Sequence, residues 1–185
     1  MTKKLSIPNQ NAFIPHPMQL FLLGTSDAQG NVNLGMFCWL NFCWDDGLSV
    51  TLCMDGQKLT KDHIEQRGIF SACLVTEDIL SLADRIACTK GTAKEQFIGD
   101  LPVGRGAKLD VPILESSPLC YELKVKQTVR LNGSDLYICS IENILIDPKL
   151  HNEKDGYDLS QVQPALVSQM QYYGMSPKGK VGSCK

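Results

Sequence analysis

The alternation of residues around an Asn-Gly pair late in the chain is the feature that most constrains the fold. Apolar and polar residues alternate from Tyr121 to Leu131, and Leu136 to Ile146 returns on the far side of the pair. A period of two indicates a strand with one buried face and one solvated face. Asn132-Gly133 is typical of a tight hairpin turn, because both residues tolerate positive φ. The sequence therefore predicts a long antiparallel hairpin here.

Shorter strands are expected in the first half of the chain. Leu20 to Thr25 is apolar and ends in a run of turn formers, and Met36 to Cys43 is rich in aromatic residues. The Asp45-Asp46-Gly47 loop contains an Asp-Gly pair, which predicts a hairpin with a partner strand over Leu48 to Met54. Ile69 to Val75 has the same apolar character and is predicted to be a further strand.

Three helices are predicted from spacing and capping signals. The first runs from Thr60 to Arg67, with Thr60 as its N-cap. The second runs from Glu77 to Ala87 and has one apolar face. The third covers Leu159 to Tyr173, where apolar residues fall at helical spacing after the N-cap candidate Asp158.

Many strands with few helices predict a protein that is mainly β with some α structure. We expect a small antiparallel β-barrel with peripheral helices. Gly99 to Pro118 has glycines, prolines and little periodicity, which predicts a long surface loop. The length of 185 residues suits a single domain over residues 1–185, with a polar tail at about 176–185.

Composition limits the classes of partner and the compartment. The net charge of −2 gives no reason to expect a nucleic acid or an acidic membrane as partner. No run of ~18 apolar residues is present, and no apolar signal core follows the basic N-terminus, so we expect a cytoplasmic protein. The eight cysteines form no C-x-x-C pair and lie mostly in apolar runs, which indicates reduced, buried thiols.

The segment from Asn33 to Trp39 could contact the flat ring of a flavin. A strand end offers backbone amides to the polar edge of such a ring, and an aromatic side chain offers a flat contact. The bland alternative, that the apolar members are ordinary strand core, is stronger if the segment is considered alone. Only one set of alternating residues can face any given pocket. The candidates to surround or hydrogen-bond the ring are Asn33, Met36, Phe37, Cys38 and Trp39.

The segment from Lys58 to Lys61 could hold the phosphate of the same ligand. A helix N-terminus has free N–H groups and a partial positive charge, Thr60 can donate its hydroxyl, and Lys58 or Lys61 can add charge. Considered alone, a capped surface helix with solvated lysines is again the stronger interpretation. The joint occurrence of both segments predicts a flavin mononucleotide (FMN) site. No side chain need act as an acid or base, and His16, His63 and His151 are expected at the surface.

With these segments in place, the chain resembles the flavin reductase-like, FMN-binding split-barrel family, and within it the flavoredoxin-type proteins. The resemblance extends from about Phe13 to about Lys180. It rests on the order of several loose motifs, whose counterparts here are Pro17 to Thr25, Asn33 with Met36, Cys38 and Trp39, Lys58 with Thr60, Lys90 to Phe97, and Tyr172 to Gly174.

The resemblance implies an antiparallel split barrel and a homodimer with FMN near the subunit interface. It also implies electron transfer through FMN from a reduced nicotinamide, NAD(P)H, or from another donor such as a redox partner protein. Three family positions in the segment from Lys90 to Phe97 differ, and Leu136 stands where a histidine is expected. These departures weaken the expectation that a reduced nicotinamide is the electron donor. They have little effect on the expected contacts to the FMN phosphate and ring.

Two alternatives remain open at this stage. The first keeps the flavin but makes the chain an electron carrier for a protein partner, without NAD(P)H turnover of its own. The second is a non-flavin binding module on the same barrel, with the cysteines as redox groups or metal ligands. The scattered cysteine spacing argues against the second alternative, although folding could still bring the cysteines together.

Overall fold

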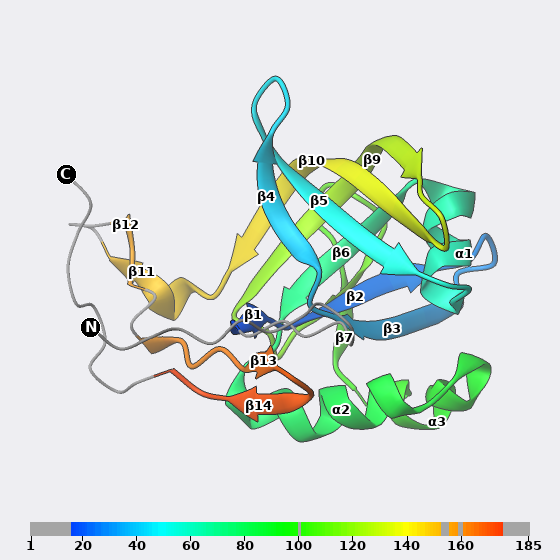
Figure 1. Ribbon diagram of the computed structural model, residues 1–185. Helices are drawn as coiled ribbons and strands as arrows, with labels where there is room; N and C mark the ends of the chain where they lie inside the picture. The colour runs from blue at the N-terminus through cyan, green and yellow to red at the C-terminus, as the bar shows by residue number, and fades with distance from the viewer. Residues whose placement is uncertain (1–15, 100, 153–155, 159–160, 176–185) are drawn as a thin grey trace, which may run out of the picture.

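A seven-stranded antiparallel sheet forms the centre of the protein in the computed structural model, which describes residues 16–99, 101–152, 156–158 and 161–175 (Figure 1). The spatial order of the strands is β3-β2-β6-β9-β10-β5-β4. Their bounds are β2 Phe21–Ser26, β3 Val32–Phe37, β4 Leu40–Trp44, β5 Leu48–Asp55, β6 Ile69–Leu74, β9 Leu119–Arg130 and β10 Ser134–Ile146.

The sheet curls around an apolar interior but does not close, so β3 and β4 remain its two edges. Register shifts between Ile138 and Cys139, and again between Ile141 and Asn143, mark irregularities in the β9–β10 pair that let these long strands bend. The interior face carries one apolar cluster, built around Leu23, Val50, Leu52, Met54, Phe70, Leu123 and Tyr137.

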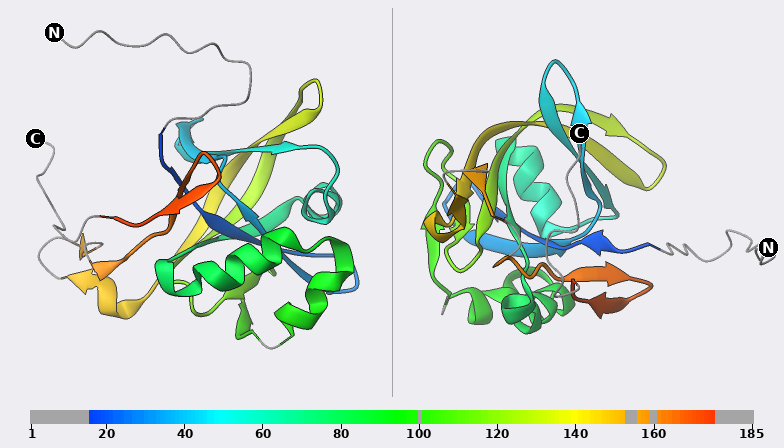
Figure 2. Two further views of the ribbon diagram at one scale, coloured as in Figure 1. Left: turned by 60° about the horizontal axis from the view of Figure 1, so that its bottom comes forward. Right: turned by 90° about the vertical axis from the view of Figure 1, so that its left-hand side faces the viewer.

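Helices and short strands cover the outer face of the sheet (Figure 2). A second apolar cluster lies on this face. The helices are α1 Leu59–Arg67, α2 Leu80–Cys88 and α3 Glu95–Ile98; α2 and α3 lie on the outer face, and α1 contacts β2 and β3. Short 3-10 turns are η1 Glu77–Ile79, η2 Gly91–Lys94 and η3 Pro148–Leu150. The small sheets pair β1 Met18–Gln19 with β13 Leu166–Ser168 and β13 with β14 Gln171–Tyr173, β7 Val103–Arg105 with β8 Pro112–Leu114, and β11 His151–Asn152 with β12 Gly156–Tyr157.

Both predicted hairpins are confirmed. β9 and β10 pair around Asn132-Gly133, and Gly133 has a φ of 90°. β4 and β5 pair around Asp46-Gly47, where both residues have positive φ. The predicted strands over Leu20 to Thr25 and Ile69 to Val75 are also present, as are the first two helices within a residue or two. Met36 to Cys43, expected as one strand, is divided between β3 and β4.

The helix predicted over Leu159 to Tyr173 is wrong. Residues 159–160 lie outside the described residues, and the later part of the segment forms β13, a turn and β14. Pro164 interrupts any helix here, and Gln169 and Met170 have φ values of 52° and 61°, which no right-handed helix adopts. Met170 is 94% exposed, so its helical spacing from its apolar neighbours does not reflect a buried face.

The long surface loop predicted over Gly99 to Pro118 is also corrected. It contains the β7–β8 hairpin, and Val111 to Leu114 is buried against the sheet. The apolar run at Val111, Ile113 and Leu114 is the local signal for this burial, which the surrounding glycines and prolines obscure.

Two properties of the described residues bear on the class of protein. None of their helices has the length and apolar character needed to span a membrane. All seven cysteines among them are free thiols, and three of these, Cys73, Cys120 and Cys139, are buried. Cys184 and the expected polar tail over 176–185 lie outside the described residues.

Candidate functional site

The first turn of α1 lies beside β3, so the two segments singled out from the sequence meet in space. β5 ends at Asp55, and a turn through Gly56, with a φ of 59°, redirects the chain into the helix. Lys58, in extended conformation, is the N-cap and has no side-chain capping bond. The prediction that Thr60 is the N-cap is therefore wrong: the helix begins at Leu59, and Thr60 lies inside its first turn.

Thr60 turns inward and joins a buried polar chain that links α1 to two strands. The Asn33 side-chain amide donates from Nδ2 to Oγ1 of Thr60 at 2.9 Å and to Oγ1 of Thr25 at 3.0 Å. All three residues are at most 2% exposed. The Oδ1 atom of Asn33 has no partner among the described residues, and neither bond uses the Thr60 hydroxyl proton.

Gly35 allows this close approach of β3 and α1. A Cβ atom on Gly35 would lie 2.7 Å from Oγ1 of Thr60 and 2.9 Å from the Phe37 ring. Any side chain here would push the helix away from the strand or break the bond between Asn33 and Thr60. The sequence reasoning missed both Gly35 and Thr25, because only the fold shows which side chains meet.

The two lysines at the helix start differ in how tightly their ammonium groups are held. Lys58 pairs with Asp55 at 3.1 Å, and the side chains are 37% and 70% exposed, so this pair contributes little and can open. Lys61 pairs with Asp135, whose side chain is 4% exposed. Arg130 joins the same carboxylate and Glu65, each at 2.6 Å. The hydrogen bond from Lys61 holds the pKa of Asp135 below its ordinary value.

The predicted ring-contacting residues do not share one face. Phe37 lies on the interior face with Asn33, whereas Met36 and Cys38 pack against the outer apolar cluster, as strand alternation requires. Trp39 lies between β3 and β4 and is 39% exposed. Burial raises the pKa of the Cys38 thiol, so Cys38 remains protonated at neutral pH.

Two further groups near this junction carry a charge or can gain one. Lys94 donates from Nζ to the carbonyl oxygen of Leu34 on β3 at 3.0 Å, and burial lowers its pKa. His63 is 7% exposed, and its Nδ1 atom has no partner among the described residues, which corrects the expectation of a surface histidine. Burial lowers the pKa of His63, against the opposing influence of Asp27. Lys94 belongs to a segment that carried the family resemblance, whereas nothing in the sequence indicated that His63 is buried.

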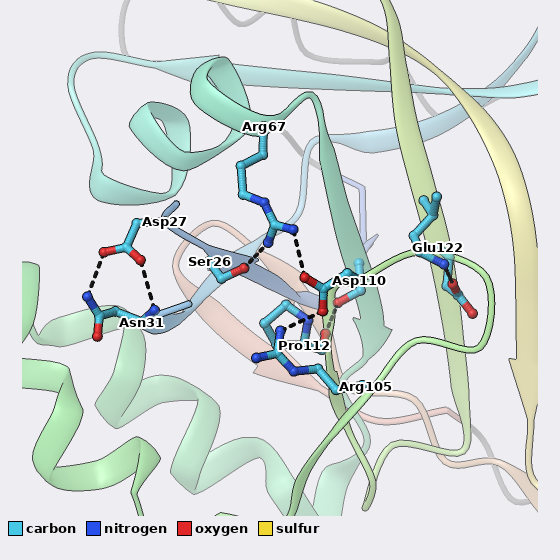
Figure 3. Close-up of polar contacts among 10 residues, drawn as sticks. Ser26, Asp27, Asn31, Arg67, Arg105, Asp110, Pro112 and Glu122 are labelled. Atoms are coloured by element: carbon cyan, nitrogen blue, oxygen red, sulfur yellow. Dashed lines mark hydrogen bonds and ion pairs between the residues drawn. The ribbon is translucent and has the colours of Figure 1, made fainter. Parts of the chain in front are cut away.

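The far end of α1 is held by a separate set of polar contacts (Figure 3). Arg67, in the last turn, donates to Ser26 on β2 and to Asp110 at 2.9 Å. Arg105 reaches the same Asp110 carboxylate at 2.9 Å. Both ends of α1 are therefore fixed to the rest of the fold, which holds the helix N-terminus in one position relative to β3.

Two hollows in the surface lie away from this junction. One, of about 390 Å³, is bordered by Glu77, Asp147, Lys149 and Gln163 among others. The second, of about 290 Å³, shares part of its lining with the first and is bordered by Leu114 and Cys120. Neither contains a residue predicted for the flavin site.

The groups at the α1–β3 junction fit the phosphate end of a flavin nucleotide. Free N–H groups of the first helical turn, an available hydroxyl proton on Thr60 and a loosely held Lys58 are the donors that a phosphate needs. The Asn33 oxygen is a buried acceptor at the same place, without a partner among the described residues. Native proteins rarely leave a buried polar atom without a hydrogen-bond partner, so this oxygen is a further sign of a binding site here.

Comparison with solved structures shows the same fold in several proteins. Flavoredoxin of Desulfovibrio vulgaris (Miyazaki F) is 22% identical, with a TM-score of 0.82, over 95% of this chain and 94% of that chain. A protein with a split barrel domain from Shewanella frigidimarina NCIMB 400 is 20% identical, with a TM-score of 0.79, over 91% of this chain and 87% of that chain. An FMN-binding protein from Thermus thermophilus is 17% identical, with a TM-score of 0.79, over 98% of this chain and 99% of that chain. The predicted antiparallel split barrel is thereby confirmed.

Comparison of sequences identifies the family. No curated protein matches the chain. The family model described as flavin reductase like domain matches residues 15–176, which include every residue predicted for the flavin site. The motifs noted in the sequence, the split-barrel fold and this match agree: the chain belongs to the flavin reductase-like domain family.

Proposed function

We propose that the protein binds FMN and acts as an oxidoreductase that passes electrons from a reduced nicotinamide, NADH or NADPH, to an acceptor. The observation that supports this most is the buried bond between Asn33 and Thr60, which fixes the start of α1 against β3 in a chain of the flavin reductase-like family. The similar protein from Thermus thermophilus is described as FMN-binding, which agrees with FMN as the flavin.

The phosphate is held by the first turn of α1. Thr60 donates its hydroxyl proton, and Asn33 orients that hydroxyl by occupying its acceptor side. Lys58 swings from Asp55 to add charge, whereas Lys61 stays with Asp135 and fixes the helix to β10. The predicted role of Lys61 as a phosphate ligand is therefore secondary to that of Lys58.

The ring lies along the edge strand β3, because a terminal strand leaves one side of its backbone without a strand partner. Phe37 is the last residue of β3 and Trp39 follows two residues later, so both offer an aromatic group at this end of the strand. Lys94 adds a positive charge beside Leu34. FMN, when bound, supplies the redox chemistry by accepting and returning electrons. The chain's residues position the cofactor, and none of them needs to transfer a proton.

A double variant tests the phosphate assignment. We expect Thr60→Ala with Lys58→Ala to weaken FMN binding by about a hundredfold, because it removes a charge-assisted contact and a hydroxyl donor. Titration of the protein with FMN, followed by flavin fluorescence, measures the change. The matched control is Lys124→Ala with Thr128→Ala, which removes the same residue types from β9. Equal FMN affinity in the two double variants would overturn the assignment.

A carrier without nicotinamide turnover is the second candidate, and two observations favour it. Gln96 and Leu136 stand where the family pattern has a lysine and a histidine, and the similar protein from Desulfovibrio vulgaris is named flavoredoxin. Steady-state oxidation of NADH and NADPH by the FMN-loaded protein separates the two. Turnover of either supports the reductase; retention of FMN without turnover supports a carrier for a redox partner protein.

We also propose a homodimer with FMN near the interface between the two copies. The β4–β5 hairpin projects from the body of the protein (Figure 1) and carries large exposed side chains, with Trp44 81% and Phe42 51% exposed. Exposed apolar patches of this kind mark protein interaction sites. This hairpin is close in sequence to Trp39, so a second copy seated on it would approach the flavin end of β3.

A further inference from the structure

The segment from Gly106 to Leu114, here called the strap, crosses the outer face of the central sheet without joining it. β8, at the end of the strap, pairs only with β7 among the described strands. The approach to the sheet is close: a Cβ atom on Gly24 of β2 would lie 2.3 Å from the carbonyl oxygen of Pro112. The strap must therefore be held by side chains rather than by a strand ladder.

Four side chains on the outer face of β6 and β9 supply these contacts. Ser71 donates to the carbonyl oxygen of Pro112. Glu122, which is fully buried, accepts from the backbone N–H groups of Ala107, Lys108 and Leu109 at 2.8, 2.9 and 2.6 Å. The remaining two side chains are the thiols of Cys73 and Cys120, and both contact Leu114.

The two thiols enclose the backbone of Leu114 between them. The Leu114 N–H group donates to Sγ of Cys73 at 3.4 Å, and the Cys120 thiol donates to the Leu114 carbonyl oxygen at 3.9 Å. Cys73 and Cys120 are also direct partners in the β6–β9 register. Directly opposed residues of antiparallel strands have Cα separations of about 4.5–5.5 Å, which lies within the range that a disulfide accepts.

The pair is asymmetric and can be reached from one side. The neighbouring Cys120 side chain lowers the pKa of Cys73, and the same contact together with burial raises the pKa of Cys120, so Cys73 ionises first. The hollow of about 290 Å³ is bordered by Cys120 and Leu114. A small oxidant in this hollow would meet Cys120, and Cys73 lies behind it as its direct partner in the β6–β9 register, although both residues are at most 1% exposed to bulk solvent.

We propose that Cys73 and Cys120 form a reversible disulfide when the protein meets a hydroperoxide, and that this bond releases the Leu114 end of the strap from the sheet. The Cys73 sulfur attacks the peroxide, the O–O bond breaks, and the leaving oxygen takes a proton to give water or an alcohol. The Cys120 sulfur then attacks the resulting sulfenic acid, the S–O bond breaks, and water leaves with the second thiol proton. Two thiols lose two electrons and two protons, and one peroxide gains them.

Release follows from the hydrogen bonds of Leu114. A disulfide has no S–H group, so the Leu114 carbonyl loses its donor, and the bonded Cys73 sulfur becomes a poorer acceptor for the Leu114 N–H group. The strap also carries Asp110, which binds Arg67 at the end of α1 (Figure 3).

The test treats the folded, full-length protein with hydrogen peroxide and maps its disulfides by mass spectrometry of unreduced peptides. Hydrogen exchange of the strap is measured before and after treatment, and again after reduction. We expect a Cys73–Cys120 linkage and about fivefold faster exchange of the Leu114 amide, both reversed by a thiol reductant. Cys120→Ser is the matched variant, because serine still donates to the Leu114 carbonyl but cannot form the bond; its exchange should not respond to peroxide.

Specific outcomes would overturn the inference. One is that Cys73 and Cys120 stay reduced while the exposed Cys88 is oxidised. Another is that either cysteine pairs elsewhere, for example with Cys139, which faces the interior cluster. A Cys73–Cys120 bond without faster exchange in the strap would disprove release. Peptide mapping of the native chain decides the first two outcomes even if Cys120→Ser fails to fold. None of these results depends on whether the protein binds FMN.

Discussion

His63 gives the protein a pH dependence at the scale of a single residue. Burial lowers its pKa below 6.5, assisted by Arg67 and opposed by Asp27 and Asp62. The unfolded chain therefore binds a proton near pH 6.5 that the folded chain does not, and the free energy of unfolding falls as the pH is lowered through that value. We expect His63→Gln to lose less stability than the native chain between pH 7 and pH 5.5. Urea unfolding at both values measures this, and equal losses would contradict it.

Glu122 is the second residue whose environment makes a prediction. Burial alone would raise its pKa, but hydrogen bonds from Asn143 and three backbone N–H groups hold it below its ordinary value. Glu122→Gln would place an NH₂ group or a weaker oxygen against these donors and leave a buried N–H group unsatisfied. We expect a loss of about 2 kcal/mol in the free energy of unfolding. The exposed Glu115→Gln is the control, with an expected change within about 0.5 kcal/mol.

At the scale of elements, the sequence predicted what is encoded locally. The β9–β10 hairpin depends on alternation and on Asn132-Gly133, and both signals lie within the hairpin itself. β13 depends on pairing with β1, which is more than a hundred residues earlier in the chain, so helical spacing misled the interpretation. The strap depends on side chains from β6 and β9, and no pattern within residues 99–118 reveals them.

The candidate site was predictable to a similar extent. The sequence assigned Asn33 and Thr60 to one ligand, but Asn33 lies before the strand predicted over Met36 to Cys43, and only the fold shows that the two side chains bond. Strand alternation predicts that the side chains of Met36 and Phe37 lie on opposite faces of the sheet. Which of the two faces borders a ligand depends on the fold. The difference between Lys58 and Lys61 arises because Asp135, from a distant strand, holds only Lys61.

At the scale of the whole molecule, the exposed β4–β5 hairpin makes a prediction about assembly. If a second copy covers it, burial of Trp44 contributes to association. We expect the native chain to sediment as two copies, and Trp44→Ser to shift it toward one. Met170→Ser is the control, because Met170 is 94% exposed but lies in the turn between β13 and β14. A native chain that sediments as a single copy at micromolar concentration would contradict the homodimer.

The attachment of the strap also has a consequence for how the chain folds. Ser71 lies opposite Glu122, and Cys73 lies opposite Cys120, so all four anchoring side chains reach the outer face only when β6 and β9 are correctly aligned. A slip of one residue in either strand would turn that strand's pair of anchors toward the interior. The strap can therefore dock only after this alignment is complete, and its docking selects the correctly aligned sheet over misaligned competitors during folding.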